Sequence, residues 1–280
     1  MCLGARKSWK TMSMSGKPAF DEAKNTFTFD LKTGGKIEKL KIVNKGLSKS
    51  SILSNSLYFQ YGFDGNTDHE LRKDFIEFIK FPKKEDEKNI NDFIQNAVDT
   101  LHRTVDLYGF DTIVFPESRS EVNRKMVSYL YMYKHPECLT FEIVKSLPEK
   151  LGFDYEMFEK DVLEGRYRDS SGIIKERYSK EQKKEETGKI KDLMEKVRSK
   201  EYFSIARDFD TKSKYRKYLR NFYKFKNADE EKSFKKLLKP KILLIDDVMT
   251  SGTTLSFVLE TIKTLNPEAE VVVFTLIGKY

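Results

Sequence analysis

The most restrictive feature of the chain is an apolar run that leads directly into two carboxylates, a hydroxyl-rich turn and a helix-like stretch. Residues 242–245, Ile-Leu-Leu-Ile, have no polar face, which is typical of a strand buried on both sides of a parallel sheet. Asp246 and Asp247 follow where we expect this strand to end. Residues 250–254, Thr-Ser-Gly-Thr-Thr, then lead into apolar residues at helical spacing.

The turn and the helix start suit the binding of one phosphate group. Its hydroxyls can donate hydrogen bonds, Gly252 permits close approach of the backbone, and the first amides of a helix attract anions. The carboxylates of Asp246 and Asp247 can accept hydrogen bonds from sugar hydroxyls. The segment therefore predicts a phosphate site with sugar-binding carboxylates beside it.

Residues 245–254, Ile-Asp-Asp-Val-Met-Thr-Ser-Gly-Thr-Thr, resemble the phosphoribosyl pyrophosphate signature of the type I phosphoribosyltransferases. The resemblance covers about residues 111–280 and implies an α/β fold, a type I phosphoribosyltransferase-like parallel sheet flanked by helices. It implies that Asp246 and Asp247 hold the ribose 2- and 3-hydroxyls, directly or through Mg2+, and are the catalytic and metal-binding residues. It also assigns substrate binding, around the 5-phosphate, to seven residues: Val248, Met249, Thr250, Ser251, Gly252, Thr253 and Thr254.

Two other motifs share part of this pattern. A strand that ends in Asp-Asp also opens receiver domains, but several elements follow that motif, whereas one helix and one strand follow here. A Walker-type phosphate loop needs a Gly-Lys-Ser/Thr ending, which residues 250–254 lack.

A second apolar run, residues 111–115, enters a polar turn, residues 116–120 (Pro-Glu-Ser-Arg-Ser), before helical spacing resumes. Ligands of α/β sheets bind where parallel strands give way to such turns. In the resembled family this position holds the pyrophosphate loop, which implies that Ser118, Arg119 and Ser120 donate to an anion. Arg119 is the leading candidate because a planar guanidinium matches a pair of diphosphate oxygens, although it could also simply fix the loop.

Further cations occur at positions that could contact the substrate. Lys145 stands at the end of the next expected strand, residues 139–144, where it could reach the pyrophosphate or be solvated. The resembled family places a flexible basic lid near residues 213–225, which closes over the substrate. Three cations there are lid candidates: Lys214, Arg216 and Arg220.

We expect two parts in the chain. Residues 1–108 form an N-terminal α+β extension, in which alternating apolar residues and a Thr-Gly-Gly turn predict a hairpin over residues 25–43, followed by two amphipathic helices. Residues 109–280 form the phosphoribosyltransferase-like domain, with a helical insertion at about 146–204. The hood over the acceptor base could come from the extension, from the insertion, or from both.

The charge of the chain is concentrated in one segment. The formal net charge is +8, and residues 205–241 hold thirteen Lys or Arg against five acids, so 13 − 5 = +8. Such a segment attracts a highly anionic substrate such as phosphoribosyl pyrophosphate, and it attracts nucleic acid equally well. Charge alone does not choose between these partners.

Composition limits the compartment. The two cysteines, Cys2 and Cys138, provide neither a disulfide framework nor a metal-binding spacing, so a reducing, cytoplasmic compartment is expected. No apolar run reaches the length of a membrane span, and residues 1–19 lack the hydrophobic core of a secretory signal, so we expect no membrane partner.

The function implied by the resemblance is transfer of the 5-phosphoribosyl group between phosphoribosyl pyrophosphate and a nucleobase, with Mg2+ and release of pyrophosphate, as in nucleotide salvage. One alternative is a catalytically silent protein of this fold that senses a ligand or forms part of an assembly. A second alternative is a nucleic-acid-binding protein that uses residues 205–241. Self-association into a homo-oligomer stays open.

Overall fold

The computed structural model describes most of the chain from residue 69 onward and four strands before it. The described residues are 18–21, 26–29, 38–40, 56–63, 69–133, 138–163, 179–203, 208, 213–249 and 253–279. Among them, no helix combines the length and the apolar character needed to cross a membrane.

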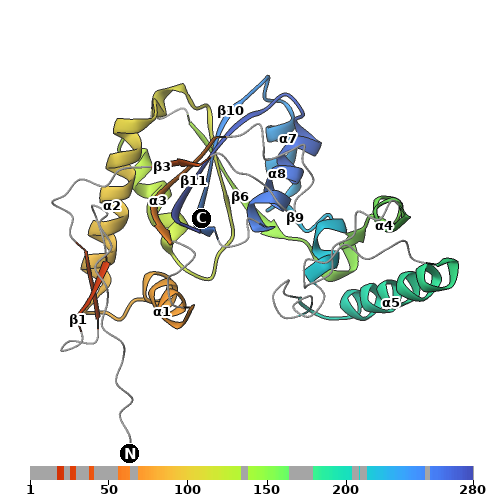
Figure 1. The fold of residues 1–280 in the computed structure, drawn as a ribbon. Helices are drawn as coiled ribbons and strands as arrows, with labels where there is room; N and C mark the ends of the chain where they lie inside the picture. The colour runs from red at the N-terminus through yellow and green to blue at the C-terminus, as the bar shows by residue number, and fades with distance from the viewer. Residues whose placement is uncertain are drawn as a thin grey trace, which may run out of the picture.

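A seven-stranded, mostly parallel sheet forms the centre of the molecule (Figure 1). Its order is β3-β4-β11-β10-β5-β6-β9, in which the four pairings from β4 to β6 are parallel and the two edge strands, β3 and β9, pair antiparallel. The strands are β3 (Glu38–Leu40), β4 (Ser56–Phe63), β5 (Thr112–Pro116), β6 (Leu139–Lys145), β9 (Tyr223–Phe225), β10 (Lys241–Met249) and β11 (Glu270–Lys279).

The connections of the sheet create a switch point between β5 and β10. From β5 the chain passes through a helix to β6 on one side, whereas β10 lies on the other side and leads through a helix to β11. The carboxyl ends of neighbouring strands at such a point border a crevice in which α/β proteins bind ligands. The residues that follow β5 and those at the end of β10 are therefore candidates for a ligand-binding site.

Helices cover both faces of the sheet. On one face, the apolar sides of α1, α2 and α3 pack against a core that includes Ile113, Leu243 and Phe274. On the other face, α7 and α8 pack against Ile242 and Leu244. The bounds are α1 (His69–Lys80), α2 (Glu87–Thr104), α3 (Val122–Tyr131), α7 (Ala228–Lys235) and α8 (Thr253–Leu265), with a short 3-10 helix, η1, at Leu107–Gly109.

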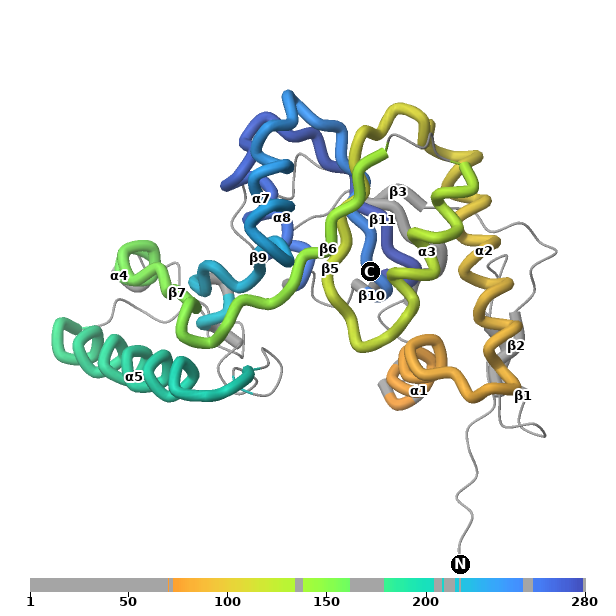
Figure 2. Tube along the Cα trace, turned by 180° about the vertical axis from the view of Figure 1, so that it is seen from behind, coloured from red at the N-terminus to blue at the C-terminus, as the bar shows by residue number. Residues whose placement is uncertain are grey.

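A smaller lobe lies to the side of the sheet beyond β9 (Figures 1 and 2). Its aromatic core, including Phe158, Tyr215 and Tyr218, is continuous with the core under α8. Within this lobe, β7 pairs antiparallel with β8. The elements are η2 (Pro148–Lys150), β7 (Gly152–Phe153), α4 (Tyr155–Leu163), α5 (Lys180–Arg198), η3 (Ser213–Tyr218) and β8 (Leu219–Arg220).

The predicted hairpin over residues 25–43 is wrong. β2 (Thr26–Phe29) pairs antiparallel with β1 (Pro18–Asp21), and β3 joins the central sheet beside β4. Alternating apolar residues indicate a strand with one buried face, but the alternation does not specify the partner of that strand.

The sheet also crosses the predicted boundary near residue 108. β4 pairs along its length with β11, from Ser56 opposite Val272 to Phe63 opposite Lys279. The segment before residue 109 thus supplies two strands of the central sheet and the helices α1 and α2 that cover it.

Candidate functional site

Asp246 and Asp247 lie at the switch point, beyond the point where β10 leaves β5. The pairing of β10 with β5 ends at Leu244 opposite Val114, whereas its pairing with β11 continues to Met249. The two carboxylates therefore lie within β10 rather than just after it, next to the loop into which β5 turns. Both are buried, with exposed fractions of 5% and 2%.

The loop after β5 contacts Asp247 through two hydroxyls. Ser118 Oγ donates to Asp247 Oδ2 at 3.1 Å, and Ser120 Oγ donates to the same oxygen at 3.0 Å. The backbone amide of Ser120 donates in turn to Ser118 Oγ at 3.2 Å, which fixes the loop. In this arrangement the two serines orient Asp247, and their hydroxyls also lie 3.1 Å from each other, where either oxygen can donate. Their predicted role as donors to pyrophosphate stays a prediction.

Lys80 also contacts Asp247, and its place in the site was not predicted from the sequence. Its Nζ lies 2.9 Å from Asp247 Oδ1, and its side chain is 27% exposed, against 3% for that of Asp247. Lys80 is the last residue of α1, which Figure 1 shows below the sheet. Many amphipathic helices end in a lysine, so its place in the sequence does not mark Lys80 as a site residue. Lys80 reaches β10 because α1 packs against the central sheet.

Asp246 is the other half of the acidic pair. The backbone amide of Asp247 donates to Asp246 Oδ1 at 2.9 Å. Burial, together with the neighbouring Asp247 charge, raises the pKa of Asp246 to about 7, although Lys80 acts in the opposite direction. Of the two buried carboxylates, Asp247 has an ion pair with Lys80, and both can accept further hydrogen bonds or bind a cation.

Arg119 and Lys145 lie close to one another at the same edge of the sheet. Lys145 ends β6, and Arg119 is exposed in the loop after β5, the strand next to β6. Burial lowers the pKa of Lys145, and the positive charges of Arg119 and Lys80 lower it further, whereas Glu117 acts to raise it. Lys145 therefore lies within electrostatic range of both Arg119 and Lys80, the lysine that pairs with Asp247.

Tyr223 is a second residue that sequence analysis missed. It begins β9 opposite Lys145 and is 6% exposed. Burial raises the pKa of its hydroxyl, and the charge of Asp246 adds to this effect, while a hydrogen bond with Thr254 opposes it. The phenol therefore lies between the acidic pair and the first turn of α8. Its position among other aromatics in the sequence gave no sign of this placement.

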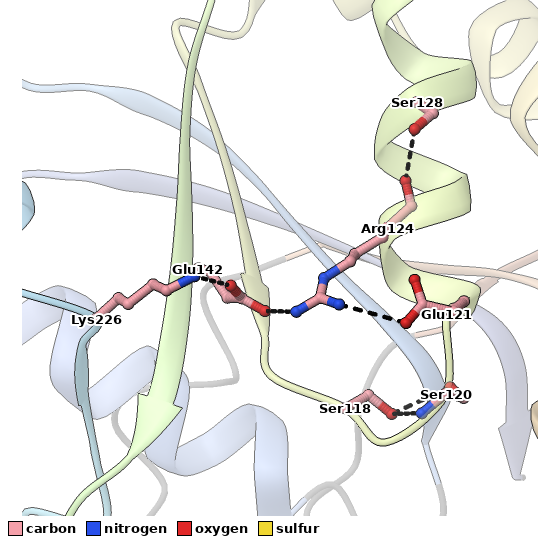
Figure 3. A network of polar contacts seen from close by, with 7 residues as sticks. All are labelled: Ser118, Ser120, Glu121, Arg124, Ser128, Glu142 and Lys226. Carbon is pink, nitrogen blue, oxygen red and sulfur yellow. Dashed lines mark hydrogen bonds and ion pairs between the residues drawn. The ribbon is translucent and has the colours of Figure 1, made fainter.

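A polar network supports the loop from outside the site (Figure 3). Glu142 on β6 accepts hydrogen bonds from Lys226 and Arg124, each at 3.0 Å. Arg124 also binds Glu121, beside Ser120. The network joins β6, the end of β9 and the first turn of α3, and thus holds in place the elements that flank the serine loop.

The remaining predicted site residues are described only in part. Residues 250–252 lie outside the described residues. Val248 and Met249 continue β10, and Thr253 and Thr254 begin α8. The helix therefore starts close after the acidic pair, as the motif predicts.

Among the predicted lid cations, Arg220 forms two ion pairs in the structure, and its role in a lid stays a prediction. It lies on β8 and forms ion pairs with Asp154 at 2.9 Å and with Glu260 on α8 at 3.4 Å. Arg220 thus ties the small lobe to α8. Lys214 and Arg216 both lie in η3, and their role in a lid stays a prediction.

Comparison of the chain with protein-family models finds no matching family, and comparison with curated proteins finds no match.

Proposed function

We propose that the chain is a type I phosphoribosyltransferase that moves a 5-phosphoribosyl group between phosphoribosyl pyrophosphate and a nitrogenous base. The observation that carries the proposal is the fixed, buried Asp246–Asp247 pair at the switch point, directly before the helix start of α8. A mostly parallel sheet flanked by helices is compatible with that fold. The order of residues 245–254 supports the same interpretation.

The two carboxylates would bind the sugar. Asp247 is oriented by Ser118 and Ser120 and keeps a lone pair on Oδ1 beside Lys80. Such an acceptor can hold a ribose hydroxyl in one position with little reorganisation, which is how positioning contributes to catalysis. The turn at residues 250–254 and the first amides of α8 would hold the 5-phosphate.

In the proposed reaction, the bond between the anomeric carbon of the ribose and the pyrophosphate oxygen breaks, and the electron pair leaves with pyrophosphate. A bond from a nitrogen of the base to the same carbon forms. An N–H nitrogen of a purine or pyrimidine releases its proton to water, whereas a pyridine nitrogen has no proton to lose and becomes cationic. The sugar carries oxocarbenium character between these events. The positive charges of Arg119 and Lys145 at the edge of the sheet would stabilise the departing diphosphate.

The donor set of the site fits a magnesium ion that takes most of its ligands from the substrate. Among the described residues, no group of three or more His, Cys, Asp and Glu side chains comes together as a metal site. Asp246 and Asp247 provide carboxylate oxygens, which a hard cation prefers, and Mg2+ commonly combines one or two carboxylates with substrate phosphates and water. Bound there, Mg2+ would neutralise charge on the diphosphate oxygens.

The structure gives little support to the nucleic-acid alternative. Within residues 205–241, Arg220, Lys226, Lys235 and Lys239 all form ion pairs with acids of the same chain. Pairing of this kind reduces the positive field that a phosphate backbone would meet. We therefore favour the transferase over a nucleic-acid-binding protein.

The proposal is tested by the affinity for phosphoribosyl pyrophosphate, measured by calorimetry with Mg2+ present. Asp247→Asn should weaken binding by about tenfold or more, because it removes the charge that accepts the ribose hydroxyl and helps to hold the metal. Equal binding by the wild type and this variant would contradict the site assignment. Specific, Mg2+-dependent binding without turnover would identify the silent, ligand-sensing alternative.

A further inference from the structure

Lys80 comes from a part of the chain that contributes nothing to the sequence motif, yet it contacts the centre of the site. Its ion pair with Asp247 measures 2.9 Å, and the carboxylate is almost fully buried. An ammonium group carries three protons, and this contact uses one of them. Because the Lys80 side chain is 27% exposed, its remaining protons can reach a second acceptor on the open side of the site.

The cations near Lys80 indicate that this second acceptor carries negative charge. Arg119 and Lys145 lie near enough for the positive charges of Arg119 and Lys80 both to act on Lys145. In the free protein Lys145 is therefore repelled by both of these cations. A ligand with several negatively charged oxygens would reduce this repulsion. Such a ligand could pair with more of these cations than a single carboxylate could.

In the free protein the hydroxyls of Ser118 and Ser120 donate to Asp247 Oδ2. Charged groups are therefore the stronger candidates to bind an incoming anion at this edge. Among the described residues, Lys80 is anchored by a buried partner, Asp247. Its anchoring reduces the entropy that a flexible lysine loses when it binds a ligand.

We propose that Lys80 binds the diphosphate group of the substrate and is held ready for it by the ion pair with Asp247. The identity of that substrate as phosphoribosyl pyrophosphate rests on the proposed function. The inference makes the segment before residue 109 part of the site itself. Lys80 would contact both Asp247, which holds the sugar, and the diphosphate, which departs from the sugar.

The experiment is calorimetric titration of the full chain with inorganic pyrophosphate in the absence of divalent cations. We expect Lys80→Met to weaken binding by roughly 10- to 100-fold, since it removes a charge-assisted hydrogen bond. Lys80→Arg should retain most of the affinity. Lys83→Met, an exposed lysine just beyond the same helix, should change it by less than about twofold and serves as the matched control.

The same substitution in a chain that already carries Asp247→Asn distinguishes direct contact of Lys80 with the diphosphate from neutralisation of the Asp247 charge by Lys80. If Lys80 only compensates Asp247, then Lys80→Met should have no effect on pyrophosphate binding in a chain that already carries Asp247→Asn. If Lys80 touches the diphosphate, the loss persists in that background. The double variant removes both partners of the ion pair and so does not leave the Asp247 charge unpaired, which keeps the test informative if Lys80→Met alone does not fold.

The outcomes distinguish this inference from the proposed function. Unchanged pyrophosphate affinity in both Lys80→Met chains, alongside measurable phosphoribosyl transfer by the wild type, would overturn the inference and leave the function standing. Lys80-dependent pyrophosphate binding by a wild type that transfers to no base would support the inference and count against the function. A wild type that binds no pyrophosphate without divalent cations would overturn the inference, and one that binds none with Mg2+ present either would count against the function as well.

Discussion

The Ser120 hydroxyl donates a 3.0 Å hydrogen bond to Asp247, and this bond joins the loop after β5 to the end of β10. Both partners are buried. The bond therefore lies where the two central strands separate, and it sets the direction of the carboxylate that we assign to ribose binding.

Removal of this hydroxyl should affect both stability and function. Ser120→Ala leaves Asp247 with one fewer donor in a buried position, so we expect a loss of about 1–2 kcal/mol in the free energy of unfolding, measured in urea. The KM for phosphoribosyl pyrophosphate should rise as well. Ser128→Ala, which removes an exposed hydroxyl on α3 that bonds only the backbone of its own helix, is the control and should alter neither quantity appreciably.

Tyr223 offers a test of the link between the acidic pair and α8. Tyr223→Phe keeps the ring in the core and removes the hydroxyl that lies beside Asp246 and Thr254. We expect a loss of about 1 kcal/mol in unfolding free energy and a several-fold higher KM, since Thr254 loses a partner. Tyr108→Phe removes an exposed phenol far along the chain and should leave KM unchanged. Equal kinetics in both variants would argue against a role for Tyr223 in the site.

Arg220 should matter to the attachment of the small lobe. Because Arg220 binds both Asp154 and Glu260, Arg220→Met should destabilise the protein by about 1 kcal/mol, with faster proteolytic cleavage in the lobe than in the sheet. Lys160→Met, an exposed lysine on α4, provides the comparison. A lid role for Arg220 would instead show as lost activity with normal stability.

Glu142 predicts a pH dependence of stability. Burial alone would raise the pKa of Glu142, but hydrogen bonds from Lys226 and Arg124 outweigh it and leave the pKa lowered. A carboxyl whose pKa is lower in the folded state stabilises the protein above its unfolded pKa and loses this contribution as pH falls through the folded pKa. Glu142→Gln should therefore be less stable than the wild type at about pH 7, and the difference should shrink toward about pH 3.

The control for that prediction is Glu149→Gln, an exposed glutamate in η2. Thermal unfolding of the three proteins across the pH range gives the comparison. A stability difference between the wild type and Glu142→Gln that is constant with pH would show that Glu142 acts through packing and not through its charge.

Local patterns in the sequence predicted most of the helices and strands of the central layer. The apolar runs at 111–115 and 242–245 correspond to β5 and β10, because a strand buried on both faces needs apolar residues at every position. The run at 139–144 lies in β6, of which Phe141 and Ile143 are buried. Helical spacing likewise located α1, α2 and α8 to within a few residues. These signals depend only on neighbours along the chain.

What the sequence did not predict depends on tertiary pairing. The partners of β2 and β4 are chosen by the packing of whole faces, and alternation within one strand does not encode that choice. Lys80 belongs to the site because α1 brings it to Asp247 on β10, and Tyr223 because β9 brings it to Thr254 at the start of α8. The ion pairs of Arg220 were not predicted either, because its partners Asp154 and Glu260 are distant along the chain.

The most direct test of the central claim is pyrophosphate release by the purified full chain with Mg2+, phosphoribosyl pyrophosphate and a panel of purine, pyrimidine and pyridine bases. We predict release that depends on one class of base and falls by at least about 100-fold in Asp247→Asn, while the far-ultraviolet circular dichroism of that variant stays unchanged. Base-dependent release that is equal in the wild type and in Asp247→Asn would contradict the assignment of Asp247. Absence of release with every base in the panel would contradict the assignment of transferase activity toward these acceptors.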